Sequence, residues 1–245
     1  METHLEINRL QQVYRRYTEA GLAGSKWSAS NPGNWAIQEE RNRKLVVLLH
    51  RAGFMPLGER QILDVGCGTG EKLAALEAWG AKPKNMFGVD LLPERINAAK
   101  RNFPAISFQA VNAEALPFQN GSFDLVLAFT VFTSILDQEM RFNVSHEIQR
   151  VLRPGGAIIW YDLRINNPAN PQVRGITRGQ LHHLFPHFES TLASITLLPP
   201  LARRLGRFTR QLYPVLGSLP FLRSHYLGAL LKTVPRQWQP LNLHN

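Results

Sequence analysis

Residues 61–80 have the sequence QILDVGCGTGEKLAALEAWG, in which a short apolar strand leads through a glycine-rich turn into a helix. Gly66, Gly68 and Gly70 lack the side chains that would keep a ligand away from the backbone of this turn. Asp90 lies twenty residues beyond Gly70, at the end of the next apolar strand. A carboxylate at that place can accept both hydroxyl hydrogens of a ribose. The segment therefore predicts a nucleoside-binding site.

Outward from this segment, apolar strands alternate with helical patterns until close to the end of the chain. This alternation predicts an α/β fold with a doubly wound, mostly parallel sheet, covered by helices on both faces. In such a sheet, ligands bind at the carboxyl ends of the strands. The expected strands are 61–66, 85–90, 106–111, 123–129, 157–163, 188–195 and 225–234, and the expected helices are 4–20, 36–53, 71–80, 93–102, 137–152 and 177–184. Pro154-Gly155-Gly156 is expected to end the helix before the fifth strand.

The length and composition favour a single domain. A chain of 245 residues with 44% hydrophobic residues can build one sizeable core. We expect residues 1–58 to form an N-terminal helical lid, 59–196 the cofactor-binding core, and 197–245 a basic helical insertion with the final strand. Cys67 is the only cysteine, which excludes an internal disulfide and a cysteine-rich zinc site and favours the cytoplasm. Neither a secretory signal nor a membrane-spanning run of about 18 apolar residues is expected.

The positive charge is concentrated in the last third of the chain. The formal net charge is +10, and in residues 171–245 nine Lys and Arg residues face one acidic residue. This distribution predicts a cationic accessory surface beside a core that is neutral overall.

Two classes of cofactor fit a glycine-rich turn of this kind: dinucleotides and S-adenosylmethionine. Dinucleotide enzymes place a pyrophosphate at the N-terminus of the following helix. In this chain Glu71 opens that helix and would repel a pyrophosphate. The methionine end of S-adenosylmethionine carries no phosphate and tolerates the acid better.

Four stretches in the expected order, ILDVGCGTG, FGVDLLPERI, VNAEALPFQNGSFDLVLAF and EIQRVLRPGGAIIWYD, cover about residues 60–163. Through them the chain resembles the class I S-adenosylmethionine-dependent methyltransferases, in particular the small-molecule branch that includes the ubiquinone and menaquinone methyltransferases. The resemblance implies a Rossmann-like sheet of seven strands and S-adenosylmethionine as the cofactor. It also implies that the glycine loop cradles the methionine moiety and that Asp90 binds the ribose. The cofactor-binding residues it implies are Asp64, Gly66, Cys67, Gly68, Asp90, Leu91, Asn112, Ala113, Glu114 and Phe129.

The chain departs from the family pattern at two places. Val111-Asn112-Ala113 stands where the family usually has Gly-Asp-Ala, and an asparagine can still accept a hydrogen bond from the adenine amino group. Thr133-Ser134 stands where many relatives have histidines, so the most convenient imidazole base is absent.

The residues expected to meet the substrate follow the fifth strand. Asp162 is our candidate catalytic base, and Tyr161, Arg164 and Asn167 are candidate substrate-binding residues, with Arg164 as an anion clamp. The alternative is that Asp162 and Arg164 pair with each other and order a loop. Methyl transfer depends mainly on alignment of the reactants, so a clear catalytic motif is not required.

Three other features have alternative interpretations. His182, His183 and His187 lack acidic or cysteine partners, so no metal site is expected. Trp27 and Trp35 either close over the substrate or pack the N-terminal helices. Residues 200–213 are expected to form one basic amphipathic helix that begins at Pro200 and is stopped by Pro214. This helix either contacts an anionic or membrane-embedded acceptor, or simply packs on the domain.

The function expected from the sequence is methyl transfer, to oxygen, on a small-molecule, lipid or glycan-precursor acceptor in natural product biosynthesis. One alternative is an RNA methyltransferase, which the basic last third would suit, although the fourth strand lacks the Asn/Asp-Pro-Pro-aromatic motif. The other is a non-catalytic S-adenosylmethionine-binding module. A cytoplasmic location with peripheral membrane association fits the absence of a leader and the cationic segment.

Overall fold

The structure, a computed structural model, describes residues 2–19, 28 and 30–233. Trp27, one of the two tryptophans expected to form a lid, lies outside the described residues.

A seven-stranded sheet forms the centre of the described chain, in the strand order β3-β2-β1-β4-β5-β7-β6. The first five strands in the sequence run parallel, and β7 lies antiparallel between β5 and β6. The expectation of a doubly wound, mostly parallel sheet is therefore confirmed. The strands are β1 (Ile62–Val65), β2 (Met86–Asp90), β3 (Ser107–Ala110), β4 (Phe123–Phe129), β5 (Leu152–Leu163), β6 (Phe188–Leu197) and β7 (Arg223–Lys232).

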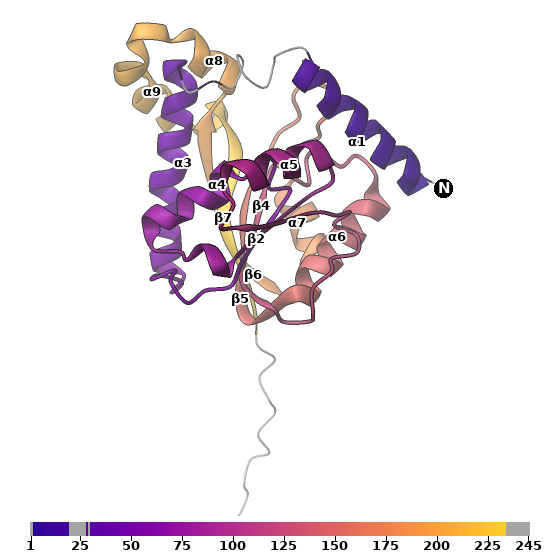
Figure 1. The fold of residues 1–245 in the computed structure, drawn as a ribbon. Helices are drawn as coiled ribbons and strands as arrows, with labels where there is room; N and C mark the ends of the chain where they lie inside the picture. Colours follow the sequence, from indigo (N-terminus) through magenta and orange to yellow (C-terminus); the bar gives the residue numbers. More distant parts are fainter. Residues whose placement is uncertain (1, 20–27, 29, 234–245) are drawn as a thin grey trace, which may run out of the picture.

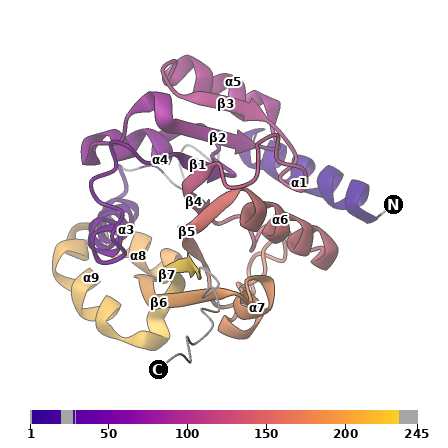
Figure 2. The ribbon, with the colours of Figure 1, turned by 90° about the horizontal axis from the view of Figure 1, so that it is seen from below.

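Helices cover both faces of the sheet (Figures 1 and 2). On one face lie α3 (Pro32–Arg51), α4 (Glu71–Ala74) and α5 (Pro93–Asn102). On the other face lie α1 (Glu2–Glu19), α6 (Gln138–Val151) and α7 (Arg178–Leu184). A smaller cap is formed by α8 (Pro199–Arg204) and α9 (Thr209–Ser218), which pack against α3. Short 3₁₀ turns occur at Ala75–Trp79, Pro83–Asn85, Gly206–Phe208 and Pro220–Leu222.

Local sequence explains where the main helices begin. The side chain of Asn31 accepts hydrogen bonds from the first turn of α3, and Asp137 does the same for α6. Thr177 and Gln180 form a capping box at the start of α7. The central strands β1 and β4 are buried on both sides, which is why they consist of nearly unbroken apolar runs.

The fifth strand begins earlier than the sequence predicts. β5 starts at Leu152, so Pro154-Gly155-Gly156 lies inside the strand and does not precede it. Its pairing with β4 shifts register between Phe123 and Leu125, as at a β-bulge. Gly155 has a positive φ of 74°, which a glycine adopts without strain.

The segment 200–213 is not the single helix that the sequence predicts. Gly206, with a φ of 51°, separates α8 from α9, whereas Pro214 lies inside α9. The glycine therefore breaks the helix, and the proline does not stop it. None of the described helices is both long enough and apolar enough to span a bilayer.

Candidate active site

A cavity of about 830 Å³ opens at the carboxyl edge of the parallel strands. It extends from the ends of β1 and β2, past β4, to Tyr161 near the end of β5. Because β7 is antiparallel to β5, its first residues reach the same edge, where they meet the last residues of β6. The cavity thus has two ends: a glycine-loop end at β1 and β2, and a far end at β5, β6 and β7.

The glycine loop after β1 is held by Asp90. The Gly68 N–H donates to Asp90 Oδ2 at 2.9 Å, and the Leu92 N–H donates to Asp90 Oδ1 at 3.0 Å. Gly66 has a φ of 70°, and a Cβ there would lie 3.0 Å from the Val131 side chain. Gly66, Gly68 and Asp90 all line the cavity, as the sequence predicts for residues that approach a ligand.

Asp64 and Cys67 lie behind this loop and do not line the cavity. Asp64 is 2% exposed, and its Oδ2 has no hydrogen-bond partner among the described residues. Burial raises the pKa of the Asp64 carboxyl to about 7 and also raises the pKa of the Cys67 thiol. An ionised carboxyl with an unsatisfied oxygen is costly in the interior, which is the physical reason for its raised pKa.

Beside Asp90, the cavity wall is formed by Leu91, Asn112 and Ala113. Glu114 does not line it. Instead, Glu114 accepts hydrogen bonds from the Asn112 side chain and from Asn143 of α6, both at 2.9 Å. Glu114 therefore fixes the orientation of Asn112 from outside the cavity.

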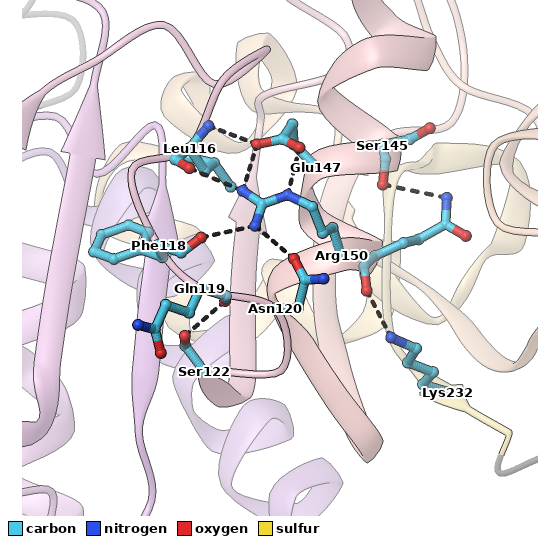
Figure 3. A network of polar contacts seen from close by, with 10 residues as sticks. Leu116, Phe118, Gln119, Asn120, Ser122, Ser145, Glu147, Arg150 and Lys232 are labelled. Carbon is cyan, nitrogen blue, oxygen red and sulfur yellow. Dashed lines mark hydrogen bonds and ion pairs between the residues drawn. The ribbon is translucent and has the colours of Figure 1, made fainter.

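The segment after Asn112 is tied to α6 through one arginine (Figure 3). Arg150 donates to both carboxylate oxygens of Glu147 at 2.7 Å, and to the backbone oxygens of Leu116 and Phe118 at 2.8 and 2.7 Å. Glu147 in turn accepts from the Leu116 N–H. This network fixes the loop between β3 and β4, and so the cavity wall that precedes it.

Aromatic and cationic groups meet at the far end of the cavity. The Arg41 guanidinium lies 5.6 Å from the centroid of the Tyr161 ring and 6.0 Å from that of Phe129. The His225 ring stacks on the Tyr161 ring, with the two centroids 4.7 Å apart. The Tyr161 hydroxyl is hydrogen-bonded to Thr196 at 2.9 Å. All five side chains line the cavity.

At this end lies a buried cation, Arg41, whose charge interacts with that of Asp64 without forming an ion pair with a described residue. Arg41 forms none of the ion pairs found among the described residues, and its side-chain hydrogen bonds, to Asn42, are 3.3 and 3.4 Å long. Burial lowers its pKa. Burial and the Arg41 charge lower the pKa of His225 to about 3, and burial raises the pKa of Tyr161 to about 12. Both rings are therefore neutral near pH 7.

Backbone strain is also concentrated here. Thr130 and Thr196, with φ of 57° and 66°, are the non-glycine residues of the described chain in the left-handed region, and both line the cavity. Such conformations persist where surrounding contacts fix them, which is common at functional sites. Thr196 is fixed by Glu40, which accepts its N–H at 3.1 Å, and by Ser224, whose hydroxyl donates to its carbonyl.

Three residues expected at the substrate do not line the cavity. Asp162 is fully buried and accepts hydrogen bonds from the Thr133 N–H, the Thr133 hydroxyl and the Leu163 N–H. Arg164 donates to the backbone oxygens of Pro220 and Arg223, and Asn167 caps the Ala169 N–H. This arrangement disagrees both with a base role for Asp162 and with an Asp162–Arg164 pair, because Asp162 orders the loop after β4 through Thr133.

The first helix covers the glycine-loop end. Leu10 and Tyr14 of α1 line the cavity, and the Tyr14 hydroxyl is hydrogen-bonded to Ser134 at 2.9 Å. Trp35 of α3 is 55% exposed and is not part of the lining. No cluster of potential metal ligands occurs among the described side chains, the histidines at 182, 183 and 187 included.

The sequence analysis missed Arg41, His225, Thr196 and Tyr14. Each belongs to a segment far in sequence from the glycine loop and sits in an otherwise ordinary amphipathic pattern. His225 reaches the cavity because β7 runs antiparallel to β5. The alternation of strands and helices in the sequence does not reveal that strand direction.

Comparisons with known proteins agree with this geometry. The sequence profile of a methyltransferase domain matches residues 62–156. The phthiotriol/phenolphthiotriol dimycocerosates methyltransferase of Mycobacterium tuberculosis is 36% identical over 149 residues, which are 55% of this chain and 54% of that protein. The chain thus spans about half the length of such relatives. The 27-O-demethylrifamycin SV methyltransferase of Amycolatopsis mediterranei is 29% identical, over 78% of this chain and 75% of that one.

A solved structure extends the similarity to nearly the whole fold. The 1,6-didemethyltoxoflavin-N1-methyltransferase of Burkholderia thailandensis, bound to 1,6-didemethyltoxoflavin and S-adenosylhomocysteine, superposes with a TM-score of 0.61 at 18% identity. The superposition covers 95% of this chain and 90% of that one. Residues 62–156 therefore match the methyltransferase-domain profile, and the glycine loop at the carboxyl edge of a seven-stranded sheet gives the chain the fold of the class I S-adenosylmethionine-dependent methyltransferases.

Proposed function

We propose that the protein binds S-adenosylmethionine and transfers its methyl group to an oxygen atom of a lipid or other small-molecule acceptor. The observation that carries the proposal is the two-ended cavity. One end combines the glycine loop with Asp90, and the other combines an aromatic wall with the cation of Arg41. A cofactor and an acceptor would therefore meet in one enclosed space.

The residues at the glycine-loop end fit the cofactor. Asp90 is the carboxylate for the ribose hydroxyls, and the loop backbone at Gly66 and Gly68 admits the methionine end. The Asp64 carboxyl, buried behind the loop, would attract the amino group of that end through its charge. Leu91 and Ala113 supply apolar surface beside Asn112 for the adenine. When bound, the cofactor supplies a methyl carbon activated by the adjacent sulfonium.

At the far end, the chain's own groups align the acceptor and polarise it. Arg41 would attract an anionic or acidic oxygen and lower the pKa of an acceptor hydroxyl beside it. Tyr161 and Thr196 fix the wall against which the acceptor lies. His225, with its pKa lowered to about 3, is a hydrogen-bonding group in this site and a weak base. Proximity and orientation would then supply most of the rate enhancement, a contribution of up to about 7–11 kcal/mol.

The names of two relatives agree with this choice of acceptor. The mycobacterial relative is named for phthiotriol dimycocerosates, and the Amycolatopsis relative for 27-O-demethylrifamycin SV. The first is a lipid methyltransferase by name, and the second names an oxygen as the methylated position. For this chain we propose, by analogy with both names, a lipophilic acceptor whose hydroxyl oxygen is methylated.

The test combines cofactor binding with turnover. Asp90→Ala should weaken S-adenosylmethionine binding in titration calorimetry by about 1.5–3 kcal/mol, the range for a hydrogen bond to a charged group. Asp124→Ala is the matched control, because Asp124 also accepts a backbone N–H, that of Gln61, but does not line the cavity. Unchanged affinity in Asp90→Ala, or measurable binding of NAD, would contradict the cofactor assignment. Cofactor binding without turnover on a panel of hydroxyl-bearing lipids would favour a non-catalytic binding module.

A further inference from the structure

Half of the exposed large apolar side chains of the described chain occur within one short segment. Ten such side chains are found, and five of them lie between residues 208 and 221. Val215 is 63% exposed and Phe221 is 71% exposed, and clustering of exposed apolar side chains is typical of an interaction surface. We call Phe208, Leu212, Val215, Leu219 and Phe221 the outer face of the cap.

The outer face is not needed to hold α9 in place. Thr209 and Tyr213 are buried on another side of the helix, where the Tyr213 hydroxyl donates to Glu40 of α3 at 2.8 Å. Leu212 and Val215 lie on one stripe of α9, and Phe208 and Leu219, directly before and after the helix, continue the spacing of four, three and four residues. The helix is therefore apolar on two sides, and only one of them has a partner in the described structure.

Arginines accompany the outer face without counter-charges. Arg204, Arg207 and Arg210 are exposed, and none of them forms an ion pair with a described residue. The sequence has no acidic residue after Glu189. The Arg207 guanidinium lies 4.9 Å from the centroid of the Phe208 ring, so its charge sits at the edge of the apolar surface.

We propose that the outer face of the cap docks on an anionic lipid bilayer, with its apolar side chains among the acyl chains and Arg204, Arg207 and Arg210 at the headgroups. An apolar stripe bordered by arginines is the pattern of helices that lie in a membrane interface. A two-fold contact between copies of this chain is disfavoured, because it would bring the same arginines against one another.

The cap lies next to the far end of the cavity. Pro199, which opens α8, and Asn34 near the start of α3 line the cavity, and α8 packs against α3. The docked face is therefore joined to the far end of the cavity through two helices. Delivery of a lipophilic acceptor along this route rests on the proposed function, whereas membrane binding does not.

The test is co-sedimentation of the full chain with vesicles of pure phosphatidylcholine and of equal parts phosphatidylcholine and phosphatidylglycerol. Wild type should bind the anionic vesicles at least about tenfold more tightly, and the preference should shrink as salt is added. Val215→Ser with Phe221→Ser should abolish most of the binding without changing the melting temperature. Phe142→Ser is the matched control, since Phe142 is 53% exposed on α6 and lies outside the cap.

The charge is tested separately. Arg207→Gln with Arg210→Gln should remove the preference for anionic vesicles, whereas Lys100→Gln with Arg101→Gln, an equal change of net charge on α5, should leave it. Because Cys67 is buried, a thiol dye on Phe221→Cys reports the outer face directly, and its emission should shift to the blue on anionic vesicles.

Three outcomes would overturn the proposal. One is equal binding of wild type to neutral and anionic vesicles, or none to either. Another is a Phe221→Cys dye that stays in water. The third is a dimer, seen by analytical ultracentrifugation, that is lost in the Val215→Ser and Phe221→Ser variant without any vesicle binding, which would make the outer face a contact between copies. None of these results depends on cofactor binding or turnover, so failure of the proposed function would be recognised separately.

Discussion

A buried carboxyl group such as that of Asp64 couples ligand binding to pH. Burial raises its pKa from 3.8 to about 7, so in the ligand-free protein it holds a proton that an exposed aspartate would have released. The cationic amino group of a ligand held by the glycine loop, in front of Asp64, would favour the ionised form and lower this pKa. Binding of such a ligand therefore releases a proton when the pH lies between the lowered pKa of the complex and about 7.

We accordingly expect the affinity for S-adenosylmethionine to rise as the pH increases from about 5 to about 7. In Asp64→Asn, which keeps the shape of the protonated carboxyl, the affinity should stay flat across this range. Calorimetry in buffers of different ionisation enthalpy would count the proton released by wild type. A rise of equal slope in Asp64→Asn would mean that another group titrates.

Buried carboxyl groups also determine how the free energy of unfolding depends on pH. Asp64 and Asp162 both have a folded-state pKa of about 7, raised by burial from 3.8. Between these values the folded state binds protons that the unfolded chain has lost. The free energy of unfolding of the ligand-free protein therefore falls as the pH rises from about 4 to about 7.

The site residues that could be predicted from the sequence are those whose role depends on a few neighbouring residues. Gly66, Gly68 and Asp90 follow two apolar strands directly, and a parallel sheet brings such strand ends together. Arg41 and His225 carry no comparable local signal, since their role depends on which strand neighbours which. Asp162 was assigned to the substrate because it ends an apolar strand, but its side chain points to Thr133.

At the scale of elements, the sequence predicted strands and helices well where apolar periodicity and capping residues agree. The helix expected at 137–152 is observed at Gln138–Val151, and Asp137 caps it. In the segment 200–213 a glycine and a proline both favour a break, and the prediction that Pro214 ends the helix is wrong. Gly206 adopts a left-handed conformation there, whereas α9 continues through Pro214 despite the lost N–H bond and the crowding of its ring against the preceding turn.

An ion pair between Glu6 and Arg9 helps to fix the first helix on the core, together with the packing of Leu10 and the hydrogen bond of Tyr14. Glu6 accepts from Arg9 at 2.7 Å and from the Leu136 N–H at 2.6 Å, and Arg9 donates to the Ser134 carbonyl. Burial alone would raise the pKa of Glu6, but these hydrogen bonds outweigh it and hold the pKa below its usual value. Its contribution to stability is therefore present above about pH 4.5 and is lost as the pH falls through the lowered pKa.

Glu6→Ala should loosen α1 without unfolding the sheet. We expect faster amide exchange in α1 and a several-fold lower cofactor affinity, because Leu10 and Tyr14 of this helix line the cavity. Exchange in β4 and β5 should not change. Glu39→Ala, at an exposed position of α3, is the control for loss of one acid. Normal α1 protection in Glu6→Ala would show that apolar packing alone holds the helix.

At the scale of the whole molecule, the two ends of the cavity are built by different parts of the chain. The parallel strands and α1 form the glycine-loop end, and α3 with the cap encloses the far end. The cap has its own small core, which includes Ile37, Leu197, Ala202 and Tyr213. A change at the contact between α3 and α8 should therefore affect the acceptor more than the cofactor.

Gly33 is where that contact is tightest. A Cβ at Gly33 would lie 2.1 Å from the Ala202 carbonyl oxygen, a backbone atom that cannot move without displacing α8. Gly33→Ala should therefore lower the free energy of unfolding by about 1–3 kcal/mol, the cost of overpacking. Amide exchange should rise in α8 and α9 and stay unchanged in the sheet, and acceptor KM should rise at constant cofactor affinity. The control is Gly179→Ala: both glycines are second residues of a helix, but a Cβ at Gly179 meets nothing within 4 Å, so alanine there should be neutral or slightly stabilising. Equal behaviour of the two variants would show that the cap adjusts freely and that its packing on α3 does not shape the acceptor end.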